Sequence, residues 1–204
     1  MLDISCFTGG IAQTNGYLLE TTAGTLAVDA PEGMAAWVKA QGKPVSHLLL
    51  THQHFDHCQD AAALQKAGAR VLAFAPFSRD LTLEVLMSFV GGSSFSVEAF
   101  TVDEVLEGRS EITAGGLTWK LAHVPGHSPD SVTFYCEKEQ LLLGGDVLFA
   151  GSIERTDFPG GSLQTLLSGI QKHVMTLPDE TRVLPGHGPE TTVGEERGSN
   201  PYLE

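Results

Sequence analysis

Lysine and arginine are scarce in this chain. The 204 residues include 12 Lys and Arg against 25 Asp and Glu, so the formal net charge is −13. Proteins that bind nucleic acids or anionic membranes do so through clustered Lys and Arg side chains. The acidic balance therefore disfavours both kinds of partner, and we expect neither a nucleic acid nor a membrane to be bound.

Cysteine and long apolar runs are also scarce. The three cysteines, Cys6, Cys58 and Cys136, lie far apart and form no Cys-x-x-Cys pair. This pattern is typical of reduced thiols in the cytoplasm rather than of a disulfide framework or a zinc finger. No apolar stretch reaches the roughly 20 residues that span a bilayer. The start of the chain lacks the basic and apolar regions of a secretory signal, so we expect a cytoplasmic protein.

The remaining composition is that of an ordinary globular protein, with 42% hydrophobic and 18% charged residues. The length predicts a single domain over residues 1–204. Strand-like and helix-like apolar patterns alternate along two comparable halves. We expect strands at 17–20, 26–29, 45–50, 71–74, 117–122, 132–136, 141–143 and 183–184, and helices at 34–40, 61–67, 81–89 and 163–174. Mostly sheet with covering helices is the economical architecture for this order, which belongs to the α/β class.

The strongest chemical signal is the segment Thr51-His52-Gln53-His54-Phe55-Asp56-His57, which follows directly on the expected strand 45–50. Four of its seven residues are of metal-ligating types. Alternate side chains of an extended segment share a side, so His52 and His54 can converge on one cation while Asp56 and His57 turn toward another. Imidazoles combined with a carboxylate suit zinc, iron or manganese in a site with an open position.

Three further candidate ligands stand in glycine-flanked loops, each just after an expected strand. They are His127 in Pro-Gly-His, Asp146 in Gly-Gly-Asp, and His187 in a second Pro-Gly-His. Side chains from separate strands can meet at one edge of a sheet in such loops.

These motifs together resemble the metallo-β-lactamase superfamily, and the resemblance covers nearly the whole chain. Within the superfamily, the segments 151–161 (GSIERTDFPGG) and 185–203 are similar to the single-domain hydrolases of the glyoxalase II (hydroxyacylglutathione hydrolase) type. The resemblance implies an αββα four-layer sandwich within the α/β class. It also implies that the C-terminal helical glutathione-binding domain of two-domain glyoxalase II proteins is absent.

The resemblance further implies two divalent metal ions per chain, Zn²⁺ first, with Fe or Mn as alternatives. The implied ligands are His52, His54 and His127 for the first metal, Asp56, His57 and His187 for the second, and Asp146 for both. Asp56 and Asp146 are thereby also the candidate catalytic residues. Asp29, at the end of an expected strand, would orient the histidine loop.

The activity implied is hydrolysis of a small-molecule thioester such as S-D-lactoylglutathione by a hydroxide that bridges the metals. A thiolate leaving group, with a pKa of about 8.5, departs without strong acid assistance. Thioester cleavage is therefore the least demanding reaction for such a site. We expect a monomer or a small homo-oligomer.

The substrate contacts follow less directly from the motifs. Arg155 stands where glyoxalase II places a cation near the substrate, and its alternative interpretation is a surface side chain paired with Asp157. Glu154 is a departure, because related hydrolases commonly carry a glycine there. Cys58 is interpreted as a small buried residue without a catalytic role.

Other functions share these motifs. A persulfide dioxygenase that uses one iron shares the His-x-His-x-Asp-His motif and a stretch similar to residues 155–158. A lactonase or a β-lactamase of the same fold is a further alternative, because a fold does not determine a substrate.

Overall fold

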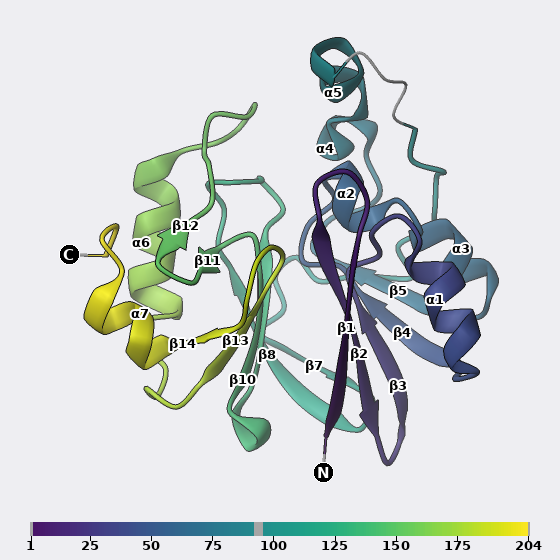
Figure 1. The fold of residues 1–204 in the computed structure, drawn as a ribbon, viewed down its shortest axis with the longest axis horizontal. Helices are drawn as coiled ribbons and strands as arrows, with labels where there is room; N and C mark the ends of the chain where they lie inside the picture. The colour runs from purple at the N-terminus through teal and green to yellow at the C-terminus, as the bar shows by residue number, and fades with distance from the viewer. Residues whose placement is uncertain (1, 92–95, 204) are drawn as a thin grey trace. The chain divides into compact units, whose positions relative to one another are not determined.

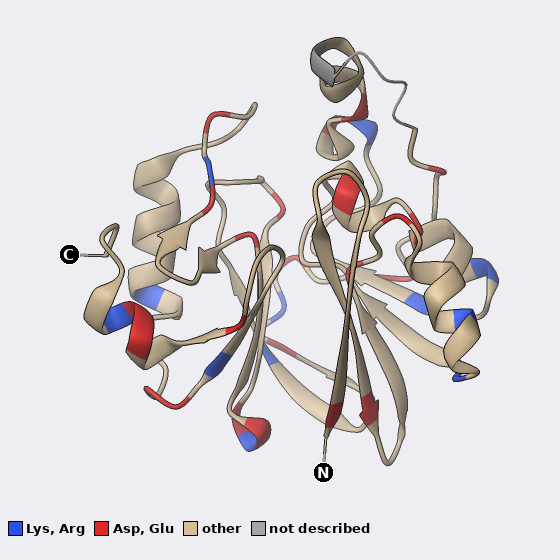
Figure 2. Ribbon diagram, in the orientation of Figure 1, with Lys and Arg blue, Asp and Glu red and all other residues tan. Residues whose placement is uncertain are grey.

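The computed structural model describes residues 2–91 and 96–203 (Figure 1). The chain divides into two units. One comprises Met1–Glu107 with Ala114–Gly116, and the other comprises Gly108–Thr113 with Leu117–Glu204. Each unit is built on one mixed six-stranded sheet with helices packed on it. In Figure 2 the acidic and basic residues are dispersed along both units, so the net negative charge does not come from one segment.

The sheet of the first unit has the strand order β1-β2-β3-β4-β5-β6. Its strands are β1 (Asp3–Gly9), β2 (Thr14–Thr21), β3 (Gly24–Val28), β4 (Val45–Leu49), β5 (Arg70–Ala73) and β6 (Glu104–Val105). The first three form an antiparallel meander, and β3 to β6 run parallel. Because β3 and β4 are parallel neighbours, the residues that follow them emerge at the same edge of the sheet.

The helices of the first unit are short, and two of them pack on the apolar face of this sheet. They are α1 (Met34–Gln41), α2 (Phe55–Cys58), α3 (Ala61–Lys66), α4 (Arg79–Thr82) and α5 (Glu84–Gly91). Met34 and Val38 of α1 and Leu64 of α3 are buried against Leu48 and Val71 of the strands. In Figure 1 α1 and α3 lie side by side on this sheet.

The sheet of the second unit has the order β14-β13-β10-β9-β8-β7. Its strands are β7 (Glu111–Ala114), β8 (Leu117–His123), β9 (Val132–Cys136), β10 (Leu141–Gly145), β13 (Arg182–Pro185) and β14 (Thr191–Thr192). The short 3-10 helix η1 (Glu137–Glu139) joins the antiparallel strands β9 and β10. The strands β10 and β13 are parallel, so their carboxyl ends share an edge.

Two helices and a small hairpin complete the second unit. The helices are α6 (Leu163–His173) and α7 (Val193–Ser199), and the hairpin is β11 (Leu148–Phe149) with β12 (Ser152–Ile153). Leu166 and Ile170 of α6 pack with Leu148 and Ile153 of the hairpin in one buried cluster. The side chain of Ser162 caps α6 by accepting a hydrogen bond from the amide of Thr165.

The expected α/β class is confirmed, and so are the longer expected elements. One expectation is wrong: the apolar pattern over 81–89 predicts one helix, but the structure has two, α4 and α5. Leu83 between them has a φ of 55°, a left-handed conformation that a continuous helix cannot contain. Within residues 2–91 and 96–203, no helix combines the length and the apolarity that crossing a bilayer would require.

Candidate metal centre

The histidine segment of the first unit lies in the turn that follows β4 and in the short helix α2. His52, His54 and His57 are all buried, with 1%, 5% and 0% of their surface exposed. The ring centroids of His52 and His54 are 4.5 Å apart, and those of His52 and His57 are 4.0 Å apart. Burial disfavours a cluster of charged imidazoliums, so these rings are suited to act as neutral nitrogen ligands.

Asp29 connects the end of β3 to this segment. Its Oδ1 accepts a hydrogen bond from the amide of Thr51 at 2.8 Å. Its Oδ2 accepts from the hydroxyl of Thr51 at 2.8 Å and from Nδ1 of His57 at 2.9 Å. Burial raises the pKa of Asp29, while the charge and hydrogen bond of His57 and the hydrogen bonds from Thr51 oppose that rise. Asp29 thus contacts the loop that the sequence analysis expects it to orient.

These hydrogen bonds determine which nitrogen of each ring carries the proton. A carboxylate only accepts, so Nδ1 of His57 donates to Asp29 and its Nε2 carries the lone pair. The Thr51 hydroxyl donates its one hydrogen to Asp29, so Nδ1 of His52, 3.2 Å from that oxygen, donates to it. Both rings therefore present Nε2 as the ligand atom, the arrangement usual for metal-binding histidines.

Asp56 is held by a residue that the sequence analysis does not single out. The hydroxyl of Thr14, buried at the start of β2, donates a hydrogen bond of 2.6 Å to Oδ2 of Asp56. The same oxygen lies 3.5 Å from Nε2 of His57. Thr14 thus restrains the carboxylate beside the imidazole, and no local pattern near residue 14 indicates this contact.

The second unit brings its three expected ligands together at one sheet edge. Asp146 follows β10 directly and His187 follows β13, and the amide of Gly186 donates to the carbonyl of Gly145 at 2.9 Å. Oδ2 of Asp146 lies 3.3 Å from Nε2 of His187 and 3.6 Å from Nε2 of His127. The parallel pairing of β10 with β13 therefore places Asp146 and His187 next to each other.

The ring of His127 is oriented by a hydrogen bond at Nδ1, the nitrogen that faces away from Asp146. Its Nδ1 donates to the carbonyl of Arg155 at 2.9 Å, so Nε2 is again the atom with the lone pair. Gly126, just before it, has a φ of 134°, and a Cβ there would lie 2.6 Å from the backbone nitrogen of Leu166 on α6. The glycine of this Pro-Gly-His motif thus lets the loop pass close to α6.

Glu154 also lies among these groups. Ligand atoms of Asp146, Glu154 and His187 are all within 4.8 Å of one another. In the sequence Glu154 is only a departure from the family pattern, and its position next to Arg155 is the one signal that it lies near the site. The structure brings it to the same cluster as two expected ligands.

Arg155 and Asp157 form the pair that the sequence analysis gives as an alternative. Nε of Arg155 lies 2.6 Å from Oδ1 of Asp157, and Nη2 lies 2.7 Å from Oδ2. The guanidinium hydrogen bonds lower the pKa of Asp157 to about 2. The guanidinium carbon also stands 4.4 Å from the centre of the Phe158 ring. The side chain of Arg155 is exposed, so it remains accessible to an anionic molecule.

The donor set of each unit fits a divalent transition metal. Each unit combines imidazole Nε2 atoms with a carboxylate, a mixture that suits zinc, iron or manganese. The hydrogen bonds on Nδ1 of His52, His57 and His127 leave the Nε2 lone pairs for coordination. The thiol of Cys58 is not part of this set, because its Sγ donates to the carbonyl of Gln53 at 3.3 Å.

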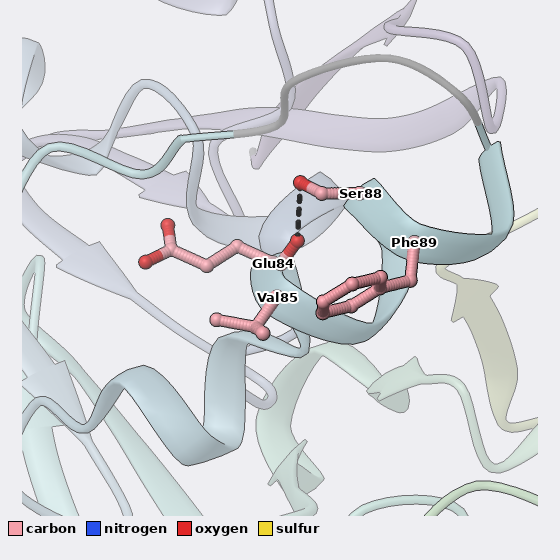
Figure 3. Close-up of a pocket in the computed structure, with 4 residues that line it drawn as sticks. All are labelled: Glu84, Val85, Ser88 and Phe89. Atoms are coloured by element: carbon pink, nitrogen blue, oxygen red, sulfur yellow. Dashed lines mark hydrogen bonds between the residues drawn. The ribbon is translucent and has the colours of Figure 1, made fainter.

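A surface pocket elsewhere in the first unit is a poorer candidate site. It has a volume of about 270 Å³ and is lined by Glu84, Val85, Ser88 and Phe89 of α5 (Figure 3). The Glu84 carboxylate already bonds to Arg79 and to the amide of Val97. Its lining therefore offers no cluster of ligand atoms like those of Asp146 and His187.

Comparison with known proteins agrees with this chemistry. Residues 9–187 match the family model described as the metallo-beta-lactamase superfamily. The probable metallo-hydrolase YqgX of Bacillus subtilis (strain 168) is 35% identical over 198 residues, which cover 95% of this chain and 94% of that protein. The hydroxyacylglutathione hydrolase GloC of Haemophilus influenzae is 35% identical over 158 residues, which cover 76% of this chain and 74% of that protein.

Solved structures show the same fold. The crystal structure of the BLEG-1 B3 metallo-beta-lactamase has a TM-score of 0.87 at 33% identity, over 98% of this chain and 99% of that one. The structure of TTHA1623 in a di-iron-bound form has a TM-score of 0.81 at 34% identity, over 98% of this chain and 100% of that one. The metallo-β-lactamase fold that the resemblance implies is therefore confirmed.

Proposed function

The chain belongs to the metallo-β-lactamase superfamily and is a metallo-hydrolase, and from that premise we propose that it is a thioesterase of the glyoxalase II type. Its substrate is a small thioester such as S-D-lactoylglutathione. The observation that carries this proposal is the 35% identity to a protein named hydroxyacylglutathione hydrolase, over 76% of this chain. The ordered imidazole and carboxylate donors of the two units supply the residues that such a hydrolase needs.

The ligand assignment is part of the proposal. His52, His54 and His127 would hold one metal, Asp56, His57 and His187 the other, and Asp146 both. Bound divalent metals would polarise the thioester carbonyl and lower the pKa of a bound water toward about 7. The chain's own residues orient the donors: Asp29 and Thr51 hold the imidazoles of His57 and His52. Zn²⁺ is the first candidate, and the di-iron form of a relative supports iron as the alternative.

One further residue, Arg155, concerns substrate binding, and the chemistry of the leaving group concerns product release. Arg155, exposed and close to the His127 backbone contact, would bind the anionic part of the substrate. The leaving thiolate has a pKa of about 8.5 and needs no acid from the protein. A cytoplasmic location, a single domain over residues 1–204 and a monomer or small homo-oligomer complete the proposal.

The test is hydrolysis of S-D-lactoylglutathione by the purified chain after metal removal and separate reloading with zinc, iron and manganese. We expect turnover that returns with metal and is abolished in Asp146→Ala. Glu180→Ala, which removes an exposed carboxylate just before β13, is the matched control and should keep full activity. Failure with every metal across a panel of thioesters, in protein that retains metal, would exclude the thioesterase.

β-Lactam hydrolysis is a second candidate, favoured by the 33% identity and TM-score of 0.87 to a B3 metallo-beta-lactamase. A chromogenic cephalosporin in the same reloading series tests it. An amide nitrogen is a poorer leaving group than a thiolate, so we expect the thioester to be cleaved much faster. Oxygen uptake with glutathione persulfide in the iron-loaded chain tests the dioxygenase alternative, and we expect none.

A further inference from the structure

Glu154 adds a second carboxylate to the ligand cluster of the second unit. Its carboxylate oxygen, an oxygen of Asp146 and a ring nitrogen of His187 all lie within 4.8 Å of one another. Asp146 is buried, with 4% of its surface exposed, and the other two residues are partly buried. Oε1 of Glu154 accepts a hydrogen bond from the Arg155 amide at 2.7 Å, and an ionised carboxylate has about four lone-pair sites on its two oxygens.

The backbone that carries Glu154 is held in place from α7. Glu154 directly follows β12, and the buried Glu196 accepts a hydrogen bond from the amide of Gly151 at 2.9 Å. Asn200 donates to the carbonyl of Ser152 at 3.0 Å and to Glu196 at 2.7 Å. On the other side, the carbonyl of Arg155 accepts Nδ1 of His127. These contacts on both sides fix where the Glu154 side chain begins.

The electrostatics of the cluster favour a bound cation. Two carboxylates a few ångströms apart repel each other when both are ionised. One imidazolium at His187 would offset only half of their charge, whereas a divalent cation offsets all of it. Carboxylate oxygens are also hard ligands. Manganese and iron accept hard ligands more readily than zinc, a softer ion, does.

We propose that Glu154 is an additional oxygen ligand of the metal held by Asp146 and His187. This inference rests on the metal centre of the proposed function. It makes that metal's ligand set richer in carboxylate than the motif residues alone would. The site should therefore hold Mn²⁺ or Fe²⁺ more strongly, relative to Zn²⁺, than it does without Glu154.

The experiment measures metal binding rather than turnover. Full-length wild type, Glu154→Gln and Glu154→Asp are stripped of metal and titrated with Mn²⁺ and with Zn²⁺ against a chromophoric chelator. Metal content is measured by elemental analysis. We expect Glu154→Gln to weaken the binding of one metal by about 10- to 100-fold, with a larger loss for Mn²⁺ than for Zn²⁺. Glu154→Asp keeps the charge but withdraws the oxygen, so it should also lose affinity.

Controls separate this inference from its premise. Glu180→Gln removes the same charge just before β13. The new side-chain amide oxygen can still accept the hydrogen bond from Nε2 of Gln140, so this variant should bind metals as wild type does. Equal metal affinities for wild type and Glu154→Gln would overturn the role of Glu154 as a ligand and leave the proposed function standing. If Glu154→Asp kept full metal affinity and Glu154→Gln lost it, the ligand role would be wrong, and Glu154 would act only through its charge. A wild-type chain that binds no metal would overturn both the inference and the proposed function.

Discussion

Oδ2 of Asp29 accepts a hydrogen bond of 2.9 Å from Nδ1 of His57, and both side chains are almost completely buried. The same carboxylate holds the amide and the hydroxyl of Thr51. One side chain at the end of β3 thus sets the ring orientation of His57 directly and that of His52 through Thr51. The histidine segment is ordered by a residue more than twenty positions earlier in the chain.

Asp29→Asn should weaken metal binding by about 10- to 100-fold, because loss of a partner that orients a ligating histidine usually has that effect. The side-chain amide has one accepting oxygen, so it cannot keep the hydrogen bond from the Thr51 amide together with those from the Thr51 hydroxyl and His57. Competition with a chromophoric chelator measures the change. Asp103→Asn, which alters a carboxylate on the far side of β5, is the control, and equal affinities in the two variants would contradict the role of Asp29.

Gly126→Ala should lower the free energy of unfolding by roughly 3 kcal/mol or more. The backbone at φ 134° is strained for alanine, and the new Cβ would lie 2.6 Å from the backbone of Leu166. Gly42→Ala, with a φ of 68° and open space around it, should cost only about 1 to 2 kcal/mol. Urea unfolding of both variants measures the difference. A loss no larger than that of Gly42→Ala would show that the loop can move away from α6.

Glu196→Ala should destabilise the chain by roughly 2 to 4 kcal/mol, since a buried donor left without its acceptor costs about 1 to 3 kcal/mol, while Thr191 and Asn200 keep second acceptors in Glu195 and Ser152. The donors concerned are the amide of Gly151, the hydroxyl of Thr191 and the side-chain amide of Asn200. Glu180→Ala on the surface should stay within about 0.5 kcal/mol of wild type. Thermal or urea unfolding measures both, and a neutral Glu196→Ala would disprove the supporting role of this network.

Arg155→Ala should raise KM for an anionic thioester by roughly 2- to 5-fold, the size expected for one exposed charge contact. The metal content should not change. Arg182→Ala removes another exposed arginine in a two-point pair, with Glu190, and is therefore a matched control that should leave KM unaltered. Steady-state kinetics on both variants make the comparison. An unchanged KM in Arg155→Ala would mean that Arg155 does not bind the substrate and serves only in the surface pair with Asp157.

The Arg155–Asp157 pair should persist in acid. Arg155 lowers the pKa of Asp157 from 3.8 to about 2. A depressed carboxyl pKa stabilises the fold above the unfolded value, and this contribution is lost as the pH falls through about 2. The carboxyl carbon of Asp157, followed by NMR, should titrate near pH 2 in wild type and near 3.8 in Arg155→Ala. A midpoint that does not move would mean that the arginine is not the cause.

The sequence alone was sufficient for much of the fold and for the types of ligand. The buried strand 45–50, the helix 163–174 and the strands 132–136 and 141–143 follow from local apolar patterns, because burial of one face requires that spacing. The break at Leu83 does not, since an apolar pattern records which side chains are buried and not the sign of φ.

The histidine segment, the two Pro-Gly-His motifs and Asp146 carry their chemistry in their residue types, and so the family could be identified before any coordinates. Only the tertiary structure decided which groups hold these side chains in place. Thr14 reaches Asp56 across 42 residues, the Arg155 carbonyl reaches His127 across 28, and Glu196 reaches the hairpin before Glu154 across 45. Such contacts depend on strand register and loop path, which bring distant residues together, and local sequence does not encode either.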